Sequence, residues 1–120
     1  FEVGRIKELA EHLPHLSEAL LALLPRIVDL EDPFAAFDLY HPEMQGKSSI
    51  KYVLPALYPE MNYDQLDIRD GEMASMTYLR LLRGETDTPE ADRRALLAYC
   101  KLDTQAMVKI LAYLKFMLLE

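Results

Sequence analysis

The longest stretch without a helix breaker is residues 88–119, TPEADRRALLAYCKLDTQAMVKILAYLKFMLL. A hydroxyl at Thr88, a proline at position 89 and acidic residues in the first turn are together typical of a helix start. Side chains of low polarity then recur at steps of three and four, at Leu97, Cys100, Thr104, Met107, Leu111, Leu114 and Leu118. We predict one long helix whose stripe of these residues faces the core.

Shorter elements are expected before this helix. Apolar periodicity predicts helices over residues 1–13, 16–24, about 50–57 and 72–83. Ser48 is the expected cap of the third of these, Pro55 should bend or shorten it, and Gly84 should end the fourth. The β-branched run RIVDL at residues 26–30, which lies between two prolines, predicts one short strand. The expected fold class is mainly α, with about five helices and one short strand.

Composition and charge restrict the class of protein. A chain of 120 residues with 51% hydrophobic and 28% charged residues is typical of one globular domain. Its net charge of −7 argues against a surface that grips nucleic acid by counterion release. A nuclease site remains compatible, because such sites gather acids around cations.

Location and completeness are also indicated by the sequence. The longest apolar runs are too short to cross a bilayer, no secretory signal opens the chain, and one cysteine excludes a disulfide framework. We therefore expect a cytoplasmic protein. The chain begins at Phe1 inside a predicted helix, and the single strand has no convincing partner in the sequence. Both features lead us to expect a piece of a longer protein.

Tyr99 and Asp103 lie one turn apart in the long helix and share one face. A carboxylate on a largely apolar face must be exposed, paired with a basic residue or bound to a metal. In two-metal phosphoryl transfer an acid holds a cation while a hydroxyl orients the attacking water, so the pair suits that chemistry. Tyr63 and Asp67 repeat the spacing, but they lie in a loop and are interpreted as turn residues.

Other candidate motifs have simpler interpretations. Residues 46–49, GKSS, lack the first glycine and the strand of a phosphate-binding loop and are interpreted as a helix cap. A weaker possibility stays open, in which Lys47, Ser48 and Lys51 contact a nucleic-acid phosphate at that helix N-terminus. Cys100 and the six methionines are interpreted as core residues, and the three histidines as surface residues.

Three segments carry a resemblance to a known family: residues 26–30 (RIVDL), 46–75 (GKSSIKYVLPALYPEMNYDQLDIRDGEMAS) and 96–111 (LLAYCKLDTQAMVKIL). They resemble the C-terminal part of a bacterial domain-of-unknown-function family, numbered 2779. That family is similar to the RNase-H-like DEDD exonucleases of the Tyr-x-x-x-Asp subgroup. The resemblance covers nearly all 120 residues. It implies a single domain fragment over residues 1–120, the helical C-terminal half of an RNase-H-like α/β domain.

The same resemblance implies roles for individual residues. Asp103 would be the last acidic metal ligand, and Tyr99 would hydrogen-bond the attacking water. Phe1 and Glu2 resemble the end of the second exonuclease motif, although most relatives have Asp in place of Glu2. Asp29 resembles an acid that is usually structural. The implied catalytic residues are thus Tyr99, Asp103 and Glu2, with Asp103 and Glu2 as ligands of Mg²⁺ or Mn²⁺ in the complete domain.

Two functions follow as expectations. The resemblance implies that the whole protein is a metal-dependent 3'-5' exonuclease-like phosphodiesterase acting on DNA or RNA. The fragment alone should be inactive, because two carboxylates cannot form a two-metal site that needs about four. The alternative is a non-catalytic helical interaction or dimerisation module, in which Tyr99 and Asp103 form a surface pair and an exposed apolar face binds a partner or a second copy.

Overall fold

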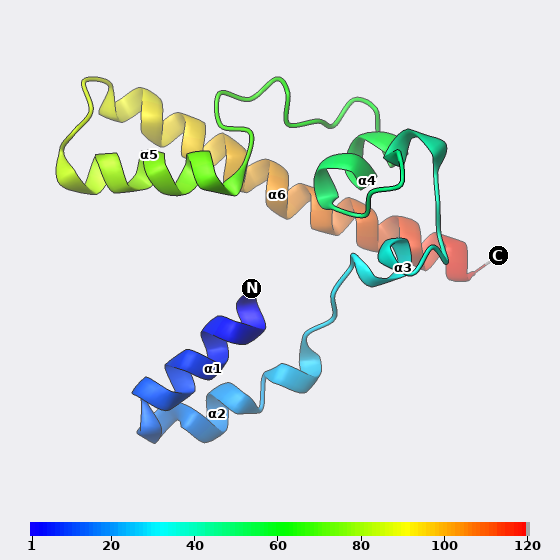
Figure 1. The fold of residues 1–120 in the computed structure, drawn as a ribbon, viewed down its shortest axis with the longest axis horizontal. Helices are drawn as coiled ribbons and strands as arrows, with labels where there is room; N and C mark the ends of the chain where they lie inside the picture. The colour runs from blue at the N-terminus through cyan, green and yellow to red at the C-terminus, as the bar shows by residue number, and fades with distance from the viewer. Residues whose placement is uncertain (120) are drawn as a thin grey trace.

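The computed structural model describes residues 1–119 and contains no strand among them. Within these residues lie the α-helices α1 (Glu2–His12), α2 (Ser17–Leu21), α3 (Asp32–Ala35), α4 (Ile50–Leu57), α5 (Gly71–Arg83) and α6 (Pro89–Leu118) (Figure 1). Single turns of 3₁₀-helix occur at η1 (Pro14–Leu16), η2 (Leu24–Arg26) and η3 (Pro42–Met44). The prediction of a mainly α fold is confirmed.

The strand expected at residues 26–30 was a wrong prediction. Arg26 is the last residue of η2, and Ile27 is extended with φ −85° and ψ 125°. Its β-branched neighbour Val28 is 77% exposed. Extended backbone becomes a strand only when a neighbouring chain completes the hydrogen-bond ladder, and no such neighbour lies within the described residues. The segment is an extended connector between α2 and α3.

Local capping signals set the bounds of α5. The Asp70 carboxylate accepts a hydrogen bond of 2.8 Å from the Met73 amide and caps the helix start. Gly84 ends the helix with φ +67°, a left-handed conformation that glycine adopts without steric cost. The end of the helix at Gly84 agrees with the sequence prediction.

The expected cap of α6, Thr88, is its N-cap in the structure, whereas the N-cap of α4 is one residue after the expected Ser48; neither N-cap side chain makes a capping hydrogen bond. The Ser48 hydroxyl donates to Glu31 at 2.5 Å, and the N-cap of α4 is Ser49. Near the start of α6 the Thr86 hydroxyl donates to Asp92 at 2.6 Å and accepts the Thr88 amide. Both helices therefore begin at or next to the predicted residue, and near the start of α6 the Thr86 hydroxyl makes the polar contacts in place of Thr88.

The core lies where α4 and the loop at residues 58–70 pack on α6. One cluster of buried side chains comprises Phe34, Met44, Val53, Ala56 and Ile110, and a second comprises Leu54, Tyr63 and Ala106. We call these two adjoining clusters the α4–α6 core. α5 packs antiparallel against the N-terminal half of α6, away from this core (Figure 1).

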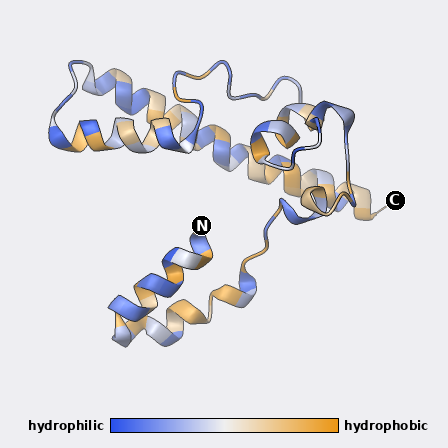
Figure 2. Ribbon diagram, viewed as in Figure 1, coloured by the Kyte–Doolittle hydropathy of each residue, from blue (hydrophilic) through white to orange (hydrophobic). Residues whose placement is uncertain are grey.

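The face of α6 predicted to be buried is mostly exposed, and of its seven residues only Leu114 packs against the α4–α6 core. Leu97, Met107 and Leu118 are 69%, 56% and 86% exposed, whereas Ala106 and Ile110 are 0% and 4% exposed. Apolar residues occur on both sides of the helix, so periodicity alone does not select one (Figure 2). Although α6 has 30 residues, neither it nor another helix within residues 1–119 is apolar enough over a sufficient length to cross a membrane.

The molecule is more open than a compact domain of its size. Its accessible surface is 8992 Å², against roughly 6600 Å² expected for a compact monomer of this length. Its radius of gyration is 17.4 Å, whereas a compact domain of this length has a radius of gyration of about 14 Å. The α1–α2 hairpin packs mainly on itself and lies apart from α4, α5 and α6 (Figure 1). The packing therefore leaves much apolar surface exposed.

Candidate functional site

A cavity of about 590 Å³ joins parts of the chain that are distant in sequence. It is lined by residues 1–3 at the start of α1, residues 27–31 of the connector, Asp32 of α3, residues 48–50 at the start of α4 and the middle of α6. Its apolar wall comes from the α4–α6 core, including Phe34, Val53 and Ile110. The volume lies within the range of small-molecule sites, roughly 300–1,000 Å³.

The polar lining of this cavity is acidic. Its carboxylates are Glu2, Asp29, Glu31, Asp32 and Asp103, and no lysine, arginine or histidine is among the described residues that line it. Asp29 accepts the Glu31 amide at 2.9 Å and so stabilises a turn of the connector. A concave surface lined by one sign of charge raises the local concentration of counterions, so this cavity favours cations.

Asp103 is half-buried and is held by a hydroxyl from the 58–70 loop. The Tyr63 hydroxyl donates a hydrogen bond of 2.5 Å to Asp103 Oδ1. Tyr63 is only 4% exposed and packs with Leu54 and Ala106 in the α4–α6 core. Burial first, and then the hydrogen bond to Asp103, raise the pKa of Tyr63 far above its ordinary value, so the hydroxyl remains a donor.

Tyr99 lies next to the same carboxylate but outside the cavity lining. Its ring is tilted by 56° to that of Tyr63, with the centroids 5.9 Å apart. A side chain at Gly71 would bring its Cβ within 3.9 Å of the Tyr99 hydroxyl, which places this hydroxyl at the start of α5. Burial and the negative charge of Asp103 raise the pKa of Tyr99. Two protonated phenols thus flank Asp103.

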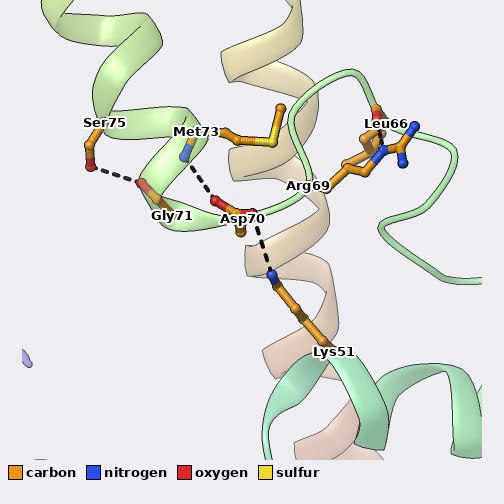
Figure 3. Close-up of polar contacts among 7 residues, drawn as sticks. All are labelled: Lys51, Leu66, Arg69, Asp70, Gly71, Met73 and Ser75. Atoms are coloured by element: carbon orange, nitrogen blue, oxygen red, sulfur yellow. Dashed lines mark hydrogen bonds and ion pairs between the residues drawn. The ribbon is translucent and has the colours of Figure 1, made fainter.

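A set of polar contacts at the start of α5 holds the 58–70 loop in place (Figure 3). Asp70 caps α5 and lies 3.9 Å from Lys51 Nζ on α4, so one carboxylate joins the two helices. Arg69 Nε donates to the Leu66 carbonyl at 3.2 Å. These contacts anchor the end of the loop that carries Tyr63, which helps to hold its ring against α6.

The structure brings together three of the residues singled out from the sequence. Glu2, Asp29 and Asp103 line the same cavity, and Tyr99 adjoins Asp103 from outside it. Within residues 1–119 no group of three or more histidines, cysteines, aspartates or glutamates is arranged to hold a metal ion. Carboxylate oxygens are nevertheless the donors that Mg²⁺ and Mn²⁺ prefer, and Mg²⁺ often takes only one or two with water completing its shell. The carboxylates that line this cavity are therefore the type of ligand that either ion prefers.

Several sequence interpretations need correction here. Tyr63 is a buried core residue that contacts Asp103, and not merely a turn residue. The apolar residues around it, at positions 61, 63, 66 and 68, were the signal that could have identified a packed loop. Cys100 is exposed, and Met76 and Met107 are 57% and 56% exposed, so these three are not core residues. Met44 is 1% exposed and is a core residue, as predicted.

Residues 1–49 match the model of a protein family described as a domain of unknown function (DUF2779). No curated protein and no solved structure matches the chain. The matched segment contains Glu2 and Asp29, ends at the N-cap of α4 and does not reach Asp103. The resemblance expected over nearly the whole chain is thus supported over this part of it. Across residues 1–49 the chain is similar to this domain family.

Proposed function

We propose that this chain is the helical part of an RNase-H-like, metal-dependent 3'-5' exonuclease-like phosphodiesterase that acts on DNA or RNA. The observation that carries the proposal is that Glu2, Asp29 and Asp103 all line one acidic cavity. These residues come from α1, the connector and α6, so the folded chain assembles them from distant segments. A cavity without basic side chains among its described lining residues favours a cation over a free anion.

Each residue has a defined role in this proposal. A bound Mg²⁺ or Mn²⁺ ion supplies stabilisation of the negative charge that develops on a phosphodiester and a water that deprotonates easily. Asp103 and Glu2 provide carboxylates that hold it, and the Tyr99 hydroxyl, which adjoins Asp103 from outside the cavity lining of this chain, orients the attacking water in the whole protein. The isolated chain is inactive, because the remaining carboxylates come from other parts of the whole protein.

The test is Mn²⁺-dependent hydrolysis of end-labelled single-stranded DNA and RNA by the whole protein. Asp103→Asn should lower the rate at least about 100-fold. The loss of a group that only hydrogen-bonds a metal ligand already lowers activity by up to about 100-fold, and Asp103 is proposed as a ligand itself. Asp67→Asn is the matched control, because Asp67 follows Tyr63 at the same spacing but is exposed. Equal rates for the wild-type protein and Asp103→Asn would refute the assignment.

A second candidate function is supported by a different observation. Apart from Leu114, the stripe predicted to face the core is exposed, and on α5 Met76, Leu79 and Leu82 are exposed as well. The accessible surface exceeds that of a compact monomer by about 2,400 Å². A stable interface needs only about 800 Å² from each partner. This excess is spread over the whole molecule, and the exposed apolar stripe of α6 is the part of it that suits a non-catalytic module forming a homodimer.

Sedimentation equilibrium over a wide concentration range tests the dimer. Leu97→Glu should shift the equilibrium towards the monomer, because it places a charge on the exposed stripe. Lys101→Glu is the control, since it alters charge on α6 at a position that is already polar and exposed. A wild-type chain that stays monomeric at high concentration would contradict this candidate.

A further inference from the structure

The position of the Tyr63 hydroxyl is set by the packing of its ring. The side chain is 4% exposed and belongs to the same buried cluster as Leu54 and Ala106, which are both 0% exposed. Close-packed side chains of this kind keep one rotamer. The only polar atom of the side chain is the hydroxyl oxygen, and it lies 2.5 Å from Asp103 Oδ1. A rigid donor therefore meets one defined oxygen of the carboxylate.

Asp103 needs such a partner more than the other acids of the cavity. Asp103 is half-buried beside Tyr63, whereas Glu2, Asp29, Glu31 and Asp32 are exposed. An ionised carboxylate has about four acceptor positions, so one bond from Tyr63 leaves capacity for contacts towards the cavity. The hydrogen bond removes rotational freedom from Asp103 without consuming its remaining acceptor positions.

We propose that Tyr63 is a positioning residue, whose phenol holds the Asp103 carboxylate in the orientation in which it binds a divalent cation in the acidic cavity. This inference rests on the proposed function. Groups that hydrogen-bond a ligating carboxylate commonly orient it, and losing one typically weakens metal binding 10–100-fold. Tyr63 acts on the cation through Asp103 and does not itself ligate it, because its buried hydroxyl donates to Asp103 and its side chain does not line the cavity.

The decisive experiment measures Mn²⁺ affinity of the whole protein without substrate, by electron paramagnetic resonance of the free ion. Tyr63→Phe keeps the ring in the core and removes only the hydroxyl, and it should weaken binding about 10–100-fold. Tyr52→Phe is the matched control and should bind as the wild type does, because the Tyr52 hydroxyl contacts Lys47 at 2.6 Å, away from Asp103. Asp103→Asn should weaken binding further.

The outcomes separate this inference from the proposed function. If the wild type binds Mn²⁺ and Asp103→Asn does not, but Tyr63→Phe binds like the wild type, the positioning role is refuted and the proposed function stands. If the wild type binds no Mn²⁺, both are refuted. Tyr63→Phe added to Asp103→Asn should have no further effect on affinity, and an additional loss would show that Tyr63 acts by another route.

A measurement on the wild-type protein covers the case in which Tyr63→Phe does not fold. Carbon NMR of protein labelled at the Tyr63 ζ-carbon and the Asp103 carboxylate follows both groups during a Mg²⁺ titration. The two signals should shift with the same midpoint, since the hydrogen bond joins them. A shift of the Asp103 carboxylate with an unchanged Tyr63 signal would overturn the inference.

Discussion

The face of α6 that packs in the core can be tested by two substitutions on the same helix. Ile110→Ala removes a side chain that is 4% exposed and lies in the α4–α6 core, and Leu97→Ala removes an isomeric side chain that is 69% exposed. The structure predicts a large loss of stability for Ile110→Ala and a small one for Leu97→Ala. Sequence periodicity had predicted burial at Leu97.

The magnitudes follow from the exposed fractions. Truncation to alanine removes three carbons, worth about 0.8 kcal/mol each when fully buried. For Ile110 this is about 2.4 kcal/mol, and the cavity left behind raises the cost to about 3–4 kcal/mol. Only about a third of Leu97 is covered, so its loss costs about 0.7 kcal/mol. The higher helix propensity of alanine lowers that to about 0.5 kcal/mol.

Urea denaturation followed by circular dichroism measures both changes, at a protein concentration low enough to prevent self-association. With a denaturant slope of about 1–3 kcal/mol per molar urea, Ile110→Ala should lower the midpoint by roughly 1–4 M. Leu97→Ala should lower it by no more than about 0.5 M. Equal shifts, or a larger shift for Leu97→Ala, would refute the packing of α6 described above.

Three further predictions concern the surroundings of the site. Asp70→Ala should lower the free energy of unfolding by about 1 kcal/mol, because α5 loses its cap. Lys51→Ala should lower it by less than about 0.5 kcal/mol, because the ion pair with Asp70 is partly exposed. Thermal unfolding measures both changes, and equal losses would contradict this difference. Since the pKa of Tyr63 is raised in the folded state, stability should be full below the unfolded value of 10.0 and fall as the pH rises above it. Urea midpoints between about pH 8 and about pH 11.5 should therefore fall less for Tyr63→Phe than for the wild type. Cys100 is exposed and should react with Ellman's reagent in the folded protein about as fast as in urea; a protected thiol would contradict its position.

Features that depend on neighbouring residues could be predicted from the sequence. The end of α1 before Pro14, the cap of α5 and the start of α6 at Pro89 each result from a residue acting on its own backbone. Gly84 ends α5 for the same local reason. The sequence also identified the spacing that places Tyr99 beside Asp103, because helix geometry alone sets it.

Features that depend on distant residues could not be predicted from the sequence. The run at residues 26–30 is β-branched, but only a partner segment can make it a strand. α6 has apolar residues on two sides, and the packing of α4 against Ala106 determines which side is buried. The contact between Tyr63 and Asp103 spans 40 positions in the sequence, and no local pattern encodes it.

The length of α6 has a consequence for sequence change in this protein. Its 30 residues form a rod of about 45 Å, with Asp103 near the midpoint and Ile110 two turns further on. One residue inserted between them would rotate the carboxylate by about 100° away from Tyr63 while Ile110 stayed in the core. Seven inserted residues would nearly restore the direction but displace Asp103 along the axis by about 10 Å. The intervening turns therefore tolerate changes of side chain at exposed positions, but not a change in their number of residues.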